Sequence, residues 1–163
     1  MTLARAVMTI VFLIIGLFIL TMVAGIPINN IKLFVIRNQF EKLNSQNIAQ
    51  SRLLAKRSVV GHEGASNLCD FYTGQFRASP LLKADIEIAY ENLTISSFWG
   101  DENSPLKLEI LFTDDEWFID NLYSWYQWLR DNSNKFDIRP GENTYVVYAI
   151  SLSHPPGWDL RCH

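Results

Sequence analysis

The feature that most constrains this chain is an apolar run close to its N-terminus. Residues 6–28 contain no charged side chain, and residues 7–23 include twelve Val, Ile, Leu or Phe residues. Twenty helical residues reach about 30 Å, which is the thickness of the hydrocarbon layer of a bilayer. The run from Val7 to Ile26 therefore predicts a transmembrane helix with the lipid bilayer as its partner, and we expect Pro27 to end that helix.

A cleaved signal peptide is the alternative reading of this segment. Arg5 supplies a short positive region ahead of the run, and the sequence Val23-Ala24-Gly25 offers small residues at plausible cleavage positions. The apolar run is longer than the core of about 7–15 residues that signal peptides have. We therefore expect a retained, single-pass signal anchor, with secretion after cleavage as the alternative.

Charge is distributed unevenly along the chain. Residues 1–50 carry four basic side chains and one acidic side chain, for a net charge of +3, whereas residues 51–163 carry 10 basic and 16 acidic ones, for a net charge of −6. Affinity for nucleic acid rests mainly on Lys and Arg, so the acidic part argues against a nucleic-acid partner. The basic residues after the apolar run suit anionic lipid headgroups; they are Lys32, Arg37 and Lys42.

Two signals disagree about the side of the membrane on which the rest of the chain lies. The positive-inside rule mildly favours the cytoplasm, because more basic residues follow the apolar run than precede it. Cys69 and Cys162 indicate the other side, since an even pair of cysteines suits an oxidising compartment. A disulfide closing about 94 residues would stabilise the domain by roughly 4–5 kcal/mol. We expect that disulfide and an extracytoplasmic domain, with a cytoplasmic domain as the alternative.

The chain divides by composition into three parts. Residues 1–28 form the anchor, residues 29–50 a juxtamembrane segment with an Asn, Gln and Ser-rich linker, and residues 51–163 one soluble α+β domain. In that domain we expect strands at residues 52–60, 68–78, 93–99, 106–112 and 144–153, and helices at residues 79–91 and 113–131.

The order of these elements from residue 68 onward is βαββαβ. Ser79-Pro80 is typical of a helix start, and Thr113 with Glu116 fits a capping box at the second helix. The last strand has the strongest β propensity and is expected to be central. The order is that of a ferredoxin-like split βαβ sandwich, with residues 52–60 as an extra N-terminal strand.

Several polar groups are candidates for chemistry. The acidic cluster at the second helix, namely Asp114, Asp115, Glu116 and Asp120, is explained by the helix dipole rather than by a metal. His62, Glu63 and Asp70 could serve a small-ligand-binding or hydrolytic site. The three histidines show no His-x-x-x-His spacing. We therefore expect no metal, no cofactor and no catalytic residues.

The second helix is unusually aromatic. A core stripe of Phe118 and neighbouring residues is expected, but Trp117, Tyr126 and Trp128 widen the apolar arc beyond that of an ordinary surface helix. An exposed aromatic patch of this kind suits a protein partner. We thus expect a non-enzymatic, membrane-anchored interaction module whose surface includes these three residues, and the alternative is a ligand-binding or hydrolytic domain at His62.

Overall fold

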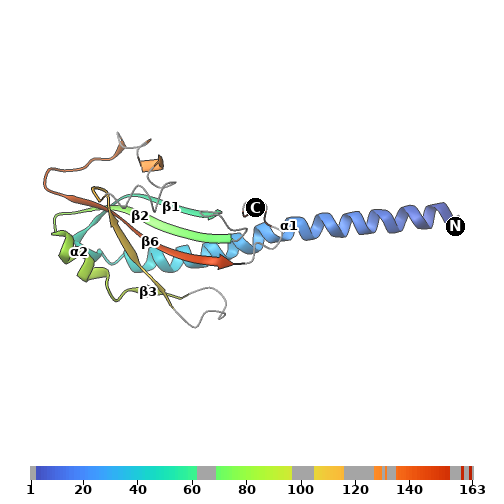
Figure 1. Cartoon of the computed structure of the whole chain (residues 1–163), viewed down its shortest axis with the longest axis horizontal. Coiled ribbons are helices and arrows are strands. Elements are labelled where there is room, and N and C mark those ends of the chain that lie inside the picture. Colours follow the sequence, from blue (N-terminus) through green and yellow to red (C-terminus); the bar gives the residue numbers. More distant parts are fainter. Residues whose placement is uncertain are drawn as a thin grey trace.

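The computed structural model describes residues 3–61, 69–96, 105–115, 127–129, 131, 135–154, 159 and 162. The elements in chain order are helix α1 (Leu3–Asn44), the short 3₁₀ turn η1 (Ile48–Gln50), strands β1 (Arg52–Gly61) and β2 (Cys69–Ser79), helix α2 (Lys83–Tyr90), and strands β3 (Thr94–Ile95), β4 (Leu106–Lys107), β5 (Glu109–Phe112) and β6 (Asn143–His154). Figure 1 shows a curved sheet with a long helix that extends well beyond it.

Four strands form one antiparallel sheet in the order β1-β2-β6-β5. The position of β6 between β2 and β5 confirms that the last strand is central. Strands β3 and β4 form a separate antiparallel pair, in which Thr94 faces Lys107 and Ile95 faces Leu106. The predicted α+β class is therefore confirmed.

The ferredoxin-like topology was a wrong prediction. A split βαβ sandwich would place the strand around residues 106–112 beside β2, parallel to it. The structure instead pairs β5 with β6, so every pairing in the sheet is antiparallel. The reason is that β1 forms a long antiparallel pair with β2 and occupies its second edge, so β5 cannot lie beside β2 and pairs with β6 instead.

The predicted strand at residues 106–112 is divided in two. Residues Leu106 and Lys107 pair with β3, whereas residues 109–112 pair with β6. Leu108 lies between the two parts, is buried, and donates its backbone N–H to the carbonyl of Leu93 at 3.2 Å. One apolar run therefore contributes a strand to each of two sheets.

We expected helix α1 to end at Pro27, but it continues through the proline to Asn44. A proline inside a helix removes one hydrogen bond and disfavours the helix by about 3 kcal/mol. Packing of the following residues offsets this cost, because Ile36 and Phe40 are 1% and 0% exposed and belong to the main core. The core thus begins on the N-terminal side of the change in composition at Ser51.

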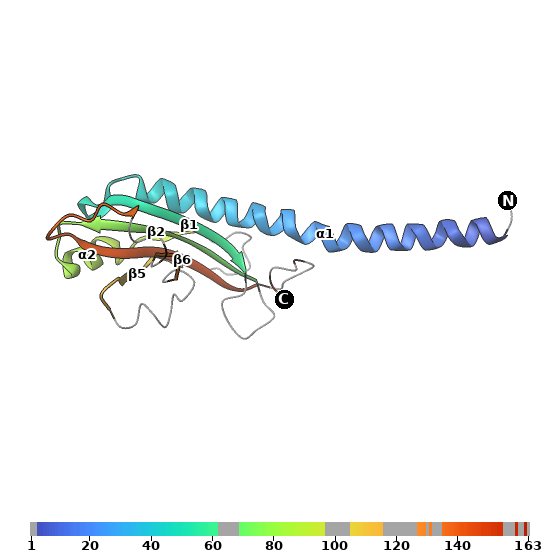
Figure 2. The ribbon, with the colours of Figure 1, turned by 90° about the horizontal axis from the view of Figure 1, so that it is seen from above.

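The two halves of α1 have different surroundings. Figures 1 and 2 show its second half lying along the sheet, while its first half projects away from the rest of the chain. The second half turns one face inward, because its buried positions 29, 36, 40 and 44 lie four or seven residues apart and so share one side of the helix. Within the described residues, we find no helix with both the length and the apolar character needed to cross a membrane.

Both faces of the four-stranded sheet carry apolar side chains. Alternate residues of the central strand point to opposite faces, so Tyr145 and Val147 join the core beneath α1 and α2, while Val146 and Tyr148 join a second cluster. The second cluster also contains Leu129 and is flanked by Trp128, Phe136 and other half-buried residues. The sheet is therefore covered on both sides.

Helix α2 begins later than predicted. Its first residue is Lys83, and Ser79 is the last residue of β2, where its hydroxyl donates to the carbonyl of Ala49 at 2.6 Å and accepts from the N–H of Leu81 at 3.1 Å. Ile86 and Tyr90 are its buried residues, whereas Leu82 is exposed. The hydroxyl that we expected to cap the helix instead fastens the end of β2 to η1.

We predict that Phe40→Ala destabilises the domain by about 3–5 kcal/mol, since a fully buried phenylalanine ring is lost. Phe34→Ala is the matched control on the same helix, because Phe34 is 57% exposed and its loss leaves no cavity. Urea unfolding of the full chain in a mild detergent, followed by tryptophan fluorescence, measures both. Equal losses for the two variants would show that α1 does not pack as described.

Candidate functional site

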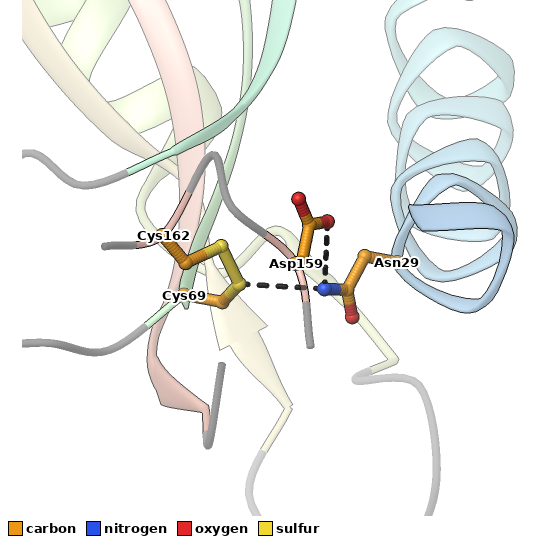
Figure 3. The surroundings of a disulfide bond; sticks show 4 residues. All are labelled: Asn29, Cys69, Asp159 and Cys162. Carbon is orange, nitrogen blue, oxygen red and sulfur yellow. Dashed lines mark hydrogen bonds between the residues drawn. A yellow bond between two sulfur atoms is a disulfide. The ribbon is translucent and has the colours of Figure 1, made fainter. Parts of the chain in front are cut away.

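The two cysteines predicted to pair are joined by a disulfide. Cys69 is the first residue of β2 and Cys162 lies 93 positions later, with their Cα atoms 4.9 Å apart. Both are fully buried within the core that includes Ile36 and Phe40 of α1. The bond therefore connects Cys162 to the first residue of β2, beside Asn29 of α1 (Figure 3).

A buried polar contact joins α1 to this disulfide. The side-chain amide of Asn29 donates to the carboxylate of Asp159 at 3.0 Å and to the sulfur of Cys69 at 3.4 Å (Figure 3). Asn29 is 5% exposed and Asp159 is 0% exposed. A buried polar group that loses its hydrogen-bond partner costs about 1–3 kcal/mol, so this contact fixes the helix against the sheet. We call Asn29, Cys69, Asp159 and Cys162 the disulfide clamp.

The disulfide clamp also has the residue types of a metal site. The ligand atoms of Cys69, Asp159 and Cys162 lie within 4.8 Å of one another, and all three residues are buried. Cysteine binds metals as a thiolate, but the two sulfurs here are bonded to each other and neither is a thiolate. The arrangement is thus a disulfide cross-link with a buried carboxyl group beside it.

Sequence reasoning identified the cysteines but missed Asn29 and Asp159. Asn29 had one usable signal, because it is a polar residue at helical spacing from Leu33, Ile36 and Phe40. Asp159 had none, since it is isolated in the chain and approaches Asn29 only through the disulfide.

The alternative site around His62 is described only in part. Asp70 lies on β2 and is buried, whereas His62 and Glu63 are outside the described residues. Two hollows among the described residues are lined by other side chains, at α2 and β5 and at the end of α1. The alternative at His62 stays a prediction that the described residues do not test.

The acidic residues at 114–115 pair with a lysine. Lys83 of α2 lies 2.7 Å from the carboxylate of Asp114 and 2.9 Å from that of Asp115, and its ammonium group is 4.8 Å from the centre of the Phe112 ring. The hydrogen bond from Lys83 lowers the pKa of Asp114 below its ordinary value. These carboxylates thus hold α2 to the end of β5, while Glu116 and Asp120 lie outside the described residues.

The predicted capping box at Thr113 lies partly outside the described residues, because Glu116 is not among them. Thr113 itself bonds to β6: its backbone N–H donates to the carbonyl of Thr144 at 3.1 Å, and its hydroxyl lies 2.5 Å from that of Thr144. Both contacts continue the pairing of β5 with β6 by one residue.

Of the aromatic residues predicted to form an interaction surface, Trp128 is described. It is half-buried, and its ring centre is 6.1 Å from that of Phe136. Phe136 in turn makes an edge contact with Phe76 on β2, at 5.0 Å between ring centres. Trp128 therefore lies on the sheet face opposite α1, while Trp117 and Tyr126 lie outside the described residues.

A second buried polar cluster lies at the other end of the packed half of α1. Arg77 of β2 donates from Nε to the hydroxyl of Ser51 at 2.7 Å, from one terminal nitrogen to the Ser51 carbonyl at 3.0 Å, and from the other to Gln75. Asn44 accepts a hydrogen bond from the hydroxyl of Tyr90 at 3.2 Å. Burial raises the pKa of Tyr90 above its ordinary value, and Arg77 opposes that shift. Sequence reasoning did not single out this cluster.

We predict that Asn29→Leu lowers the free energy of unfolding by about 1–3 kcal/mol, because the buried carboxylate of Asp159 loses this donor. Asn38→Leu is the control, since Asn38 is exposed on the same helix. Urea unfolding of the full chain in detergent, with the disulfide kept oxidised, measures the difference. No difference between the two variants would mean that the contact with Asp159 does not fasten the helix.

Comparisons of the chain with protein families, with curated proteins and with solved structures found no match.

Proposed function

We propose that this protein is a single-pass, membrane-anchored interaction module whose domain lies outside the cytoplasm. One observation carries the proposal: α1 is a single helix whose first half is apolar and exposed while its second half belongs to the domain core. An anchor built in this way would hold the domain at a defined height and orientation above the lipid surface.

The exposed half of α1 supports the membrane part of the proposal. Twelve large apolar side chains between positions 7 and 20 are each at least 47% exposed. A patch of this size on all sides of a helix is rare on a protein surface in water. Residues 7–26 have no charged side chain. As a helix they would reach about 30 Å, which is the thickness of the hydrocarbon layer.

The disulfide clamp supports the extracytoplasmic side. Disulfides persist in oxidising compartments, and this one is fully buried within the core. The clamp includes Asn29, which directly follows the apolar run, so it fastens the domain where the chain would leave the lipid.

The interaction part of the proposal rests on aromatic side chains. Trp128 and Phe136 flank the cluster on the sheet face that α1 does not cover, and Trp128 is half-buried. Trp117 and Tyr126 belong to the same proposed surface by their spacing in the sequence. Aromatic residues are enriched at the centres of protein interfaces, so a protein partner is the proposed occupant.

We predict that the wild-type chain floats with phospholipid vesicles in a sucrose gradient and resists extraction at high salt. The double variant Leu13→Arg with Leu17→Arg should lose this association, because each arginine costs about 2.5–3.5 kcal/mol within the hydrocarbon layer and the whole run gains only about 4–7 kcal/mol. The control is Leu82→Arg with Ile88→Arg, which places the same charges on exposed residues of the domain. Flotation of all three proteins alike, or of none, would refute the anchor.

The partner and the side of the membrane are tested together by a photoreactive residue at position 128 in the full chain. We expect ultraviolet light to produce a specific protein adduct in native membranes, and protease added to intact spheroplasts to digest it. A photoreactive residue at Ile88 is the control, since Ile88 is exposed on α2, away from Trp128. Equal adducts from both positions would argue against the surface, and adducts digested only after lysis would mean a cytoplasmic domain.

A further inference from the structure

The buried guanidinium of Arg77 lacks an acidic partner among the described residues. Arg77 is 4% exposed, and its three hydrogen bonds go to the neutral oxygens of Ser51 and Gln75. The ion pairs of the described residues involve other cations. A guanidinium has five N–H donors, so two are left for another acceptor. Buried charges are normally paired with an opposite charge, and the part of the chain that the structure describes offers this one none.

A groove opens beside this guanidinium. It has a volume of about 340 Å³, near the lower end of the range for small-ligand sites. Its lining combines buried amides, one apolar side chain and charged groups, namely Glu41, Asn44, Ser45, Asn47, Leu53, Lys56, Gln75 and Arg77. Asn44 and Gln75 are 3% and 4% exposed, so the polar floor of the groove is built into the core.

The charges of the groove favour an anion. Glu41 is its one acidic residue, and its carboxylate already bonds Lys56 at 3.0 Å and Arg37 at 3.2 Å. Lys56 stands at the rim with its side chain 53% exposed. The lining thus carries two positive charges against one negative charge.

We propose that this groove binds the carboxylate of a small organic acid. Arg77 pairs with the carboxylate through its remaining N–H donors, because a guanidinium and a carboxylate match in geometry. The amide oxygens of Asn44 and Gln75 already accept from Tyr90 and Arg77, so their remaining N–H groups offer hydrogen bonds to an acceptor next to the carboxylate. Leu53 lines the groove where an aliphatic part of the ligand would lie. The volume of the groove limits the ligand to about the size of a capped amino acid.

N-acetylglycine tests this proposal, with the neutral N-acetylglycinamide as its matched control. We titrate each into the full chain in detergent micelles and follow the backbone amide signals of Ser51 and Gln75 by NMR. N-acetylglycine should bind with a Kd of about 1 mM or lower, and the amide about ten-fold more weakly. Equal binding of acid and amide, or binding of inorganic phosphate without N-acetylglycine, would overturn the proposal.

Variants assign the binding to Arg77. Arg77→Gln should weaken binding about ten-fold, and Arg77→Lys should have an intermediate effect because lysine keeps the charge without the planar donors. A folded Arg77→Gln protein that binds as well as the wild type would overturn the proposal.

If Arg77→Gln does not fold, a pair of substitutions on β1 tests whether the ligand binds in the groove. Lys56→Gln should weaken binding about two- to three-fold, as expected for an exposed charge. Arg57→Gln makes the same charge change on the adjacent residue, which points to the opposite face of the strand, and should leave binding unchanged. Equal effects of the two substitutions would count against the groove.

A blocked tripeptide with a free C-terminus distinguishes the source of the carboxylate. Tighter binding than that of N-acetylglycine would assign the groove to a polypeptide terminus, which would overturn the small-acid assignment. Weaker or equal binding supports a free organic acid.

Discussion

The packing of residues 29–44 on the sheet holds this molecule together. Ile36 and Phe40 of α1 enter the same core as Phe71 of β2 and Tyr145 of β6, so the sheet has no complete core without this helix. The packing also explains why α1 continues past Pro27, since a half that is held by the sheet does not depend on an unbroken set of hydrogen bonds. Because α1 is one helix, the packing of its second half also sets the direction in which its exposed first half points.

Two buried polar clusters mark the ends of this packed segment. The disulfide clamp includes Asn29, and the cluster around Arg77 contains Asn44, fifteen residues and about 22 Å further along the helix. A covalent bond and a buried hydrogen bond join the residues of the first cluster, whereas the second leaves a guanidinium facing a groove. The covalent cross-link thus lies near the exposed half of α1, and the groove that we propose as a binding site lies at the opposite end of the packed segment.

The groove is bordered by a strained turn. Asn47, Ala49 and Gln50 have φ values of 53°, 53° and 48°, which only glycine and asparagine adopt without appreciable cost. Hydrogen bonds hold this conformation: Ser79 donates to the carbonyl of Ala49, and Ser51 donates to that of Ile48 at 2.6 Å. Ser51 also accepts from Arg77, so the strained backbone and the buried cation position each other.

The sequence by itself determined the local features: the apolar run, the strands 52–60, 68–78 and 144–153, the pair of cysteines and the α+β class. These depend on periodicity, β propensity and residue type, which neighbouring residues express without the rest of the fold. Only the tertiary structure decided the strand order, the continuation of α1 through Pro27, and the meetings of Asn29 with Asp159 and of Arg77 with Ser51. Those features depend on which sheet edge is free and on contacts between distant segments. Local sequence patterns predict neither of these.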